Sequence, residues 1–120
     1  MANGEITHVE IPSDEPERAH AFYAGLFGWQ IQTPPDYPDY AVFQSGPGDV
    51  GGAIGKRGVT APNQVRIYVT VESLDTAVAK VTELGGSVAV EITDVPGQGR
   101  YAAVVDTEGN EIGLWESPPA

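Results

Sequence analysis

The chain has 120 residues, enough for one compact domain with a buried core, and its 41% hydrophobic content is not that of a disordered protein. A net charge of −11 repels phosphate groups, so nucleic acid and anionic membranes are not expected partners. The absence of cysteine excludes disulfides, thiolate zinc sites and cysteine nucleophiles, which leaves histidine and carboxylates for any metal chemistry.

The sequence contains no signal that would direct the chain into or across a membrane. No apolar run approaches the roughly 20 residues that a membrane-spanning helix needs. A secretion signal consists of a basic segment followed by an apolar one, and the amino-terminal sequence lacks this pattern. We therefore expect a cytoplasmic protein.

The first predicted element is a strand over 5–11, along which successive side chains alternate between two faces. Ile6, His8 and Glu10 share one face, and the opposite, apolar face should pack against a helix. Residues 12–13 are expected to end the strand.

A helix is predicted over 15–27. Asp14 and Glu17 have the spacing of a capping box at its start, and Gly28 stands where a left-handed residue ends a helix. Apolar residues recur at helical spacing and form one stripe, which consists of Ala19, Phe22, Tyr23, Leu26 and Phe27.

Three short strands are predicted next, over 29–33, 40–44 and 50–55, with a proline-rich loop after the first and a turn at 45–49 after the second. The last strand is rich in glycine, which often marks the close approach of another backbone or a ligand. A polar segment with glycine and proline over 57–63 reads as a linker.

The second half of the chain repeats this order. A strand over 64–71 precedes a helix that Ser73 can cap and that glycines 85–86 end. Strands follow over 87–92, 100–105 and 111–115, separated by a loop at 94–99 and a turn at 106–110.

A shift of 58 positions places the first half of the chain over the second. Ala19 then meets Ala77, and Gly28 meets Gly86. The chain thus reads as one domain over 1–120, with module one at about 5–56 and module two at about 64–116. The predicted fold is α+β: two βαβββ modules forming curved mixed β-sheets around a cleft, with the helices outside.

Two clusters of residues resemble the vicinal oxygen chelate superfamily, which includes glyoxalase I, extradiol dioxygenases, fosfomycin resistance proteins and bleomycin-binding proteins. They are Ala21-Phe22-Tyr23…Leu26-Phe27-Gly28-Trp29 and Gly99…Asp106-Thr107-Glu108-Gly109-Asn110…Ile112-Gly113-Leu114, in which Thr107 replaces the usual proline. The resemblance implies the same two-module fold and a homodimer. It says little about activity, because these folds support unrelated chemistries.

The resemblance also implies where a divalent metal would bind, with one ligand from the first and one from the last strand of each module. His8 matches the first of these positions, but the others carry Ala53, Arg66 and Gly113. A catalytic metal needs about three protein ligands, and an arginine would repel it. We therefore predict no metal site and no cofactor.

One alternative is a shifted metal site made from His8, Glu10 and Glu111. His8 could also act as a general base, or could simply line the cleft while bonded to a neighbour. The side chain of Arg66 is expected to enter the cleft, where it would pair with a carboxylate or hold an anionic ligand.

Aromatic walls with a few polar groups are typical of small-molecule pockets. Tyr68 and Trp115 could form such walls or could pack in an ordinary core, while Gly113 and Ala53 would leave space in the cleft. Six residues are predicted to line the cleft and contact a ligand: His8, Glu10, Arg66, Tyr68, Gly113 and Trp115.

Three functions fit these features. The first is a protein of the bleomycin-resistance type that binds a small organic molecule between its modules without the usual metal. The second is an enzyme, either a glyoxalase- or dioxygenase-like lyase or oxidoreductase with an atypical metal site that includes His8, or a metal-free isomerase with His8 as its base. The third is an interaction protein that kept the fold and lost the site.

Overall fold

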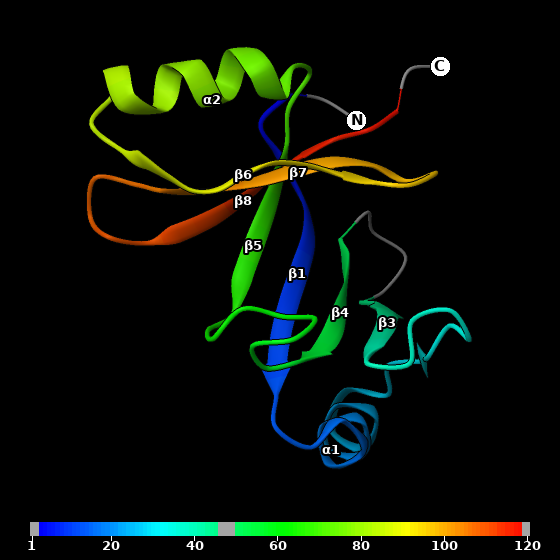
Figure 1. The fold of residues 1–120 in the computed structure, drawn as a ribbon. Helices are drawn as coiled ribbons and strands as arrows, with labels where there is room; N and C mark the ends of the chain where they lie inside the picture. Colours follow the sequence, from blue (N-terminus) through cyan, green and yellow to red (C-terminus); the bar gives the residue numbers. More distant parts are fainter. Residues whose placement is uncertain (1–2, 46–49, 119–120) are drawn as a thin grey trace. The chain divides into compact units, whose positions relative to one another are not determined.

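The computed structural model describes residues 3–45 and 50–118. Most of the turn predicted at 45–49 lies outside these residues. The chain separates into two compact units, one spanning Thr7–Arg66 and the other running from Ile67 onward together with the amino-terminal residues up to Ile6. Below, module one denotes the first five elements and module two the last five (Figure 1).

In its described residues, module one has four strands and one helix. Its strands lie in the order β2-β3-β4-β1, with β1 parallel to β4 and the other neighbours antiparallel, which makes the sheet mixed. The elements are β1 (Glu5–Ser13), α1 (Pro16–Phe27), β2 (Ile31–Gln32), β3 (Tyr40–Gln44) and β4 (Gly51–Lys56).

The core of module one lies between its sheet and α1. Ile54 of β4 is fully buried and packs with Phe43 of β3, while Ile11 and the helix residues Ala19 and Tyr23 cover this cluster. The apolar face of β1 thus meets the helix, as the alternation predicted. His8 and Glu10 therefore lie on the opposite face of the sheet.

The strand β1 continues beyond the predicted end. Pro12 and Ser13 pair in register with Gly55 and Lys56, and the carbonyl of Ser13 accepts a hydrogen bond from the Arg57 amide at 2.9 Å. The prediction that the strand ends at Pro12 was wrong, because proline lacks only a donor and is tolerated where that donor is not needed.

The start of α1 also differs from the prediction. Its N-cap is Glu15, whose side chain makes no capping bond, and the Asp14 carboxylate is bonded to Arg57 instead of completing a capping box. The predicted end is confirmed, since Gly28 has φ of 72° and its amide bonds to the Ala24 carbonyl.

The strand predicted at 29–33 is reduced to Ile31–Gln32. Trp29 does not extend it but stacks on Phe43 at a ring-centroid distance of 4.3 Å. The glycine prediction for β4 is confirmed at Gly52, where a Cβ atom would lie 2.1 Å from the Val9 carbonyl oxygen.

Module two has the same sequence of elements. Its strands lie in the order β5-β8-β7-β6, with β5 parallel to β8 and the other neighbours antiparallel. Figure 1 shows α2 lying along one face of β6, β7 and β8. The elements are β5 (Arg66–Thr70), α2 (Leu74–Glu83), β6 (Ser87–Val95), β7 (Gly99–Val105) and β8 (Glu111–Glu116).

The core of module two lies between α2 and the sheet, and it is built around Leu74, Ala102, Val104 and Leu114. Ser73 caps α2 as predicted, with its hydroxyl accepting a bond from the Thr76 amide at 3.2 Å.

The loop predicted at 94–99 is shorter than expected. Asp94 pairs with Arg100 and Val95 pairs with Gly99, so only 96–98 connect the two strands. A hairpin with a tight, glycine-containing turn explains this difference.

The architecture is α+β, and it consists of two βαβββ modules with mixed sheets, as the sequence predicted. The cleft expected between the modules stays a prediction. Neither helix in the described part of the chain has the length and apolar character of a membrane span.

Candidate functional site

A chain of three hydrogen-bonded side chains lies on the face of module one that points away from α1. The Tyr40 hydroxyl donates to Oε2 of Glu10 at 2.7 Å, and Nε2 of His8 lies 2.8 Å from the same hydroxyl oxygen. Because a phenol has one proton and gives it to Glu10, its oxygen accepts a bond from Nε2–H of His8. The imidazole and phenol rings are also nearly parallel, with an angle of 16° between them.

Burial governs the protonation of His8. Desolvation of the half-buried ring lowers the pKa of His8 from its ordinary value of 6.5, and the negative charge of Glu10 opposes this shift. The net direction is downward, so the imidazole is neutral at pH 7. A neutral imidazole can donate at one nitrogen and accept at the other, which suits both hydrogen bonding and proton abstraction.

Sequence reasoning placed His8 and Glu10 on this face but missed Tyr40, which joins them. The available signal was the alternation of β3, where Ala41 and Phe43 are buried and Tyr40 must point to the other side. The contact itself depends on strand register, since Tyr40 pairs with Gly55 of β4. One sequence does not determine that register.

In module two, Tyr68 fills the space that glycine leaves in β8. Tyr68 pairs in register with Gly113, and a Cβ atom at Gly113 would lie 2.4 Å from the tyrosine ring. The expectation that Gly113 leaves open space is therefore corrected, because the ring of Tyr68 covers it. Tyr68 is itself buried and meets the ring of Tyr101 edge-on at 6.4 Å.

Trp115 and Arg66 lie on the same two strands of module two as this pair. Trp115 is half-buried, pairs with Thr70 and Tyr101, and lies against the backbone of Gly99, where a Cβ atom would be 2.6 Å from the indole ring. Arg66 begins β5 and is buried. By strand alternation Arg66 and Tyr68 share one face.

The comparisons with known proteins assign the chain to a family. The sequence pattern of the Glyoxalase/Bleomycin resistance protein/Dioxygenase superfamily matches residues 5–114. The chain belongs to this superfamily. This confirms the resemblance to vicinal oxygen chelate proteins that the sequence carries.

Individual relatives of this superfamily member differ in length. A protein named as a glyoxylase, CFP32 of Mycobacterium tuberculosis, is 31% identical over 97% of this chain but only 45% of its own length, so the chain spans about half of that relative. A glyoxylase-like domain-containing protein of Didymella fabae is 29% identical over 98% of both chains.

Solved structures show the same fold at lower identity. The Mn(II)-bound glyoxalase from Novosphingobium aromaticivorans is 19% identical and superposes with a TM-score of 0.68 over 95% of this chain and 39% of that chain. At this identity the likeness shows the fold alone.

The residues of this superfamily member do not fit the divalent metal that the family implies. Of the four implied positions only His8 carries a metal ligand, and its ring is bonded to Tyr40. Ala53 is fully buried and has no donor atom, Gly113 lies under the ring of Tyr68, and the Arg66 guanidinium is cationic. Within residues 3–45 and 50–118, no three histidine, aspartate or glutamate side chains gather into a group that could hold a metal ion.

Proposed function

We propose that the chain binds a small organic molecule on the face of module one that carries His8, Tyr40 and Glu10, and that binding does not depend on a divalent metal. The observation that carries the proposal is the hydrogen-bonded chain of these three side chains. Small-molecule sites place a few oriented polar groups on an otherwise apolar wall, and a hydrogen-bonded chain holds such groups in fixed orientations.

The chemistry of the three side chains indicates the kind of ligand. Because the Nε2–H of His8 is directed at Tyr40 and the phenol proton is directed at Glu10, the neutral imidazole offers Nδ1 as an acceptor, which suits an uncharged ligand that donates a hydrogen bond, such as a hydroxyl group. The carboxylate of Glu10 disfavours an anion at the same place. We therefore propose an uncharged or cationic organic ligand for this face.

A second candidate function is proton transfer with His8 as the base. The lowered pKa of His8 favours the basic form at pH 7, and Tyr40 orients its ring. The reaction class that matches is removal of a proton next to a carbonyl group. The glyoxylase name of CFP32 and of other relatives supports testing carbonyl compounds first.

The metal part of the proposal is tested by calorimetric titration with Ni²⁺, Co²⁺, Mn²⁺, Fe²⁺ and Zn²⁺. We expect no binding tighter than about 1 mM, which corresponds to about −4 kcal/mol. Binding of one metal ion per chain that is lost in His8→Ala would overturn the proposal and favour a lyase or oxidoreductase with an atypical metal site.

The ligand part is tested by a thermal-shift screen of small carbonyl and hydroxyl compounds. Tyr40→Phe removes the hydroxyl that joins His8 to Glu10, and Tyr37→Phe removes a hydroxyl from an exposed tyrosine of the same module. We expect a compound that stabilises the wild type and Tyr37→Phe but not Tyr40→Phe. Equal stabilisation of all three proteins would place the ligand elsewhere.

The two candidate functions are separated by hydrogen exchange into the ligand. A bound carbonyl compound is followed by NMR in D₂O with wild type and with His8→Gln. Exchange next to the carbonyl that depends on His8 would establish catalysis, whereas binding without exchange supports a binding protein.

A further inference from the structure

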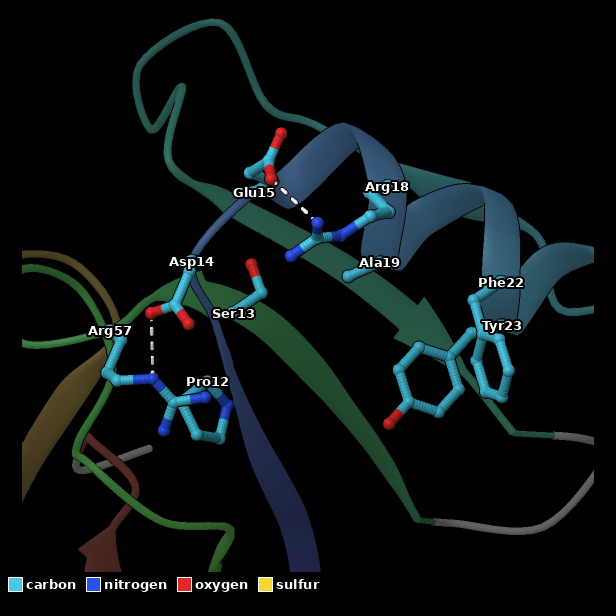
Figure 2. A pocket seen from close by; sticks show the side chains of 9 residues that line it. All are labelled: Pro12, Ser13, Asp14, Glu15, Arg18, Ala19, Phe22, Tyr23 and Arg57. Carbon is cyan, nitrogen blue, oxygen red and sulfur yellow. Dashed lines mark hydrogen bonds and ion pairs between the residues drawn. The ribbon is translucent and has the colours of Figure 1, made fainter.

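We propose that module one holds a second site, in which a carboxylate with a small apolar body binds at the amino-terminal end of α1. A cavity of about 340 Å³ opens there, between the end of β1 and the first two turns of the helix (Figure 2). Its size lies within the range of small-molecule sites. None of its lining residues belongs to the His8–Tyr40–Glu10 chain, so the inference is independent of the proposed function.

The first observation is a buried hydroxyl group that lacks a hydrogen bond. Ser13, the last residue of β1, is only 7% exposed and lines the cavity. Among residues 3–45 and 50–118 its Oγ atom has no hydrogen-bond partner, and Figure 2 shows it pointing toward the start of α1. Buried hydroxyl groups in proteins nearly always have a partner, so this one indicates a missing acceptor.

The second observation is the open amino terminus of α1, a helix of 12 residues. Glu15 makes no side-chain capping bond and Pro16 has no amide hydrogen. The amides of Glu17 and Arg18 are therefore the first donors of the helix, and they have no acceptor within it. Amides at this position, together with the helix dipole, favour an anion.

Two guanidinium groups complete the polar part of the cavity. Arg18 pairs with Glu15 at 2.7 Å, and Nε of Arg57 pairs with Asp14 at 2.9 Å. Both pairs are exposed, and exposed ion pairs are weak, so a bound carboxylate can compete for the same donors. Arg57 also donates to the Asn63 carbonyl, which holds its side chain beside the cavity.

The rest of the lining sets the class of ligand. Ala19, Phe22 and Tyr23 supply an apolar wall, and Phe22 is 59% exposed. The acidic side chains nearby and the net charge of −11 oppose a doubly charged group more than a singly charged one. A monocarboxylate with an aromatic or short aliphatic body fits both the donors and the wall.

The test is an NMR titration of the full ¹⁵N-labelled chain with benzoate, and with acetate, inorganic phosphate and benzyl alcohol as partial probes. We expect benzoate to shift the amides of Glu17 and Arg18 and to bind about tenfold more tightly than acetate or benzyl alcohol, because it uses both the donors and the wall. Tighter binding of phosphate than of benzoate would contradict the assignment to a monocarboxylate.

Variants show which groups hold the ligand. Ser13→Ala and Arg18→Gln should each weaken benzoate binding about tenfold, the usual effect of losing a hydrogen bond to a charged group. Lys80→Gln removes the same charge from an exposed position on α2 and should leave binding unchanged. Thermal unfolding checks that each variant is folded. If Ser13→Ala does not fold, Arg18→Gln still tests the site, because Arg18 is exposed.

Two results would overturn the inference. Absence of shifts at Glu17 and Arg18 at the highest benzoate concentration would contradict the carboxylate site and leave a bound water as the partner of the Ser13 hydroxyl. Equal weakening by Lys80→Gln would mean that benzoate responds to the charge of the whole chain and not to this cavity.

Discussion

At the residue scale, opposing effects set the charge of His8. Burial disfavours the imidazolium, while the carboxylate of Glu10 favours it, and burial is the larger effect. Tyr40 stands between the two groups and donates to the carboxylate. These three side chains therefore place a neutral base beside a negative charge, which is the arrangement on which the proposed ligand binding and proton transfer rest.

This arrangement predicts how stability depends on pH. The pKa of His8 is lower in the folded chain than its ordinary value of 6.5, so between these two values the unfolded chain binds a proton that the folded chain does not. Above pH 6.5 the full contribution of His8 to the free energy of unfolding is present. Below pH 6.5 the free energy of unfolding should fall as the pH drops. Denaturant unfolding between about pH 8 and 5 measures this, and His8→Gln should lose that part of the slope. Parallel curves for the two proteins would contradict the prediction.

Gly113 and Tyr68 show how one residue determines what a neighbouring strand can carry. The tyrosine ring lies where a side chain at position 113 would begin. A metal-binding side chain at 113, which is one of the ligand positions that the resemblance implies, would have to displace a buried ring. A glycine at 113 and the Tyr68 ring in its present position therefore belong to one packing arrangement.

We expect Gly113→Ala to lower the free energy of unfolding by about 1–3 kcal/mol, because its Cβ atom would overlap the Tyr68 ring. The same substitution in a Tyr68→Ala background should cost little, since the overlap is then absent. Chemical denaturation of the four proteins gives the interaction energy. Equal costs in both backgrounds would show that the ring is not the cause.

At the scale of elements, the two helices begin in different ways. The start of α2 is satisfied twice, by the Ser73 hydroxyl on the Thr76 amide and by a carboxylate oxygen of Glu116 on the Leu74 amide at 2.9 Å. The hydrogen bond from the Leu74 amide has the largest effect on the pKa of Glu116, which it lowers. The Arg100 side chain lowers this pKa further. In contrast, α1 has no side-chain cap. The donors that α1 leaves open form the site proposed above.

This difference predicts unequal effects of cap substitutions. Ser73→Ala should lower the free energy of unfolding by about 1 kcal/mol, because it removes a capping bond. Glu15→Ala at the matching position of α1 removes only an exposed ion pair with Arg18 and should change stability by less than about 0.5 kcal/mol. Thermal or denaturant unfolding compares the two, and equal losses would mean that the Ser73 bond contributes no more to stability than the exposed ion pair.

At the scale of the whole molecule, charge and apolar surface oppose one another. The chain has 17 acidic and 6 basic residues, yet Phe22, Leu26 and Phe27 of α1 are each more than half exposed. Exposed apolar side chains favour association, whereas like charges on two copies oppose it. The homodimer that the resemblance implies would therefore be sensitive to salt.

We expect light scattering after size-exclusion chromatography to give twice the chain mass of 12.6 kDa. Salt screens repulsion between acidic chains, so the dimer should dissociate at a lower protein concentration in high salt than in low salt. A mass of 12.6 kDa at every salt and protein concentration would contradict the homodimer.

Local patterns were sufficient to predict the fold class. Alternation along β1, helical spacing before Gly28, the Ser73 cap and the 58-residue repeat all concern residues near one another or copies of one unit. Alternation likewise placed His8 and Glu10 on one face. These properties follow from backbone geometry, which a short stretch of sequence determines.

Contacts between distant strands decided the rest. The Tyr40 bond to Glu10, the Tyr68 ring over Gly113 and the unpartnered Ser13 hydroxyl all depend on which strands pair and in what register. A shift of one residue would exchange the faces of a strand and leave its local pattern unchanged. The sequence therefore placed His8 and Glu10 on one face, while only the folded sheets determined that Tyr40 joins them.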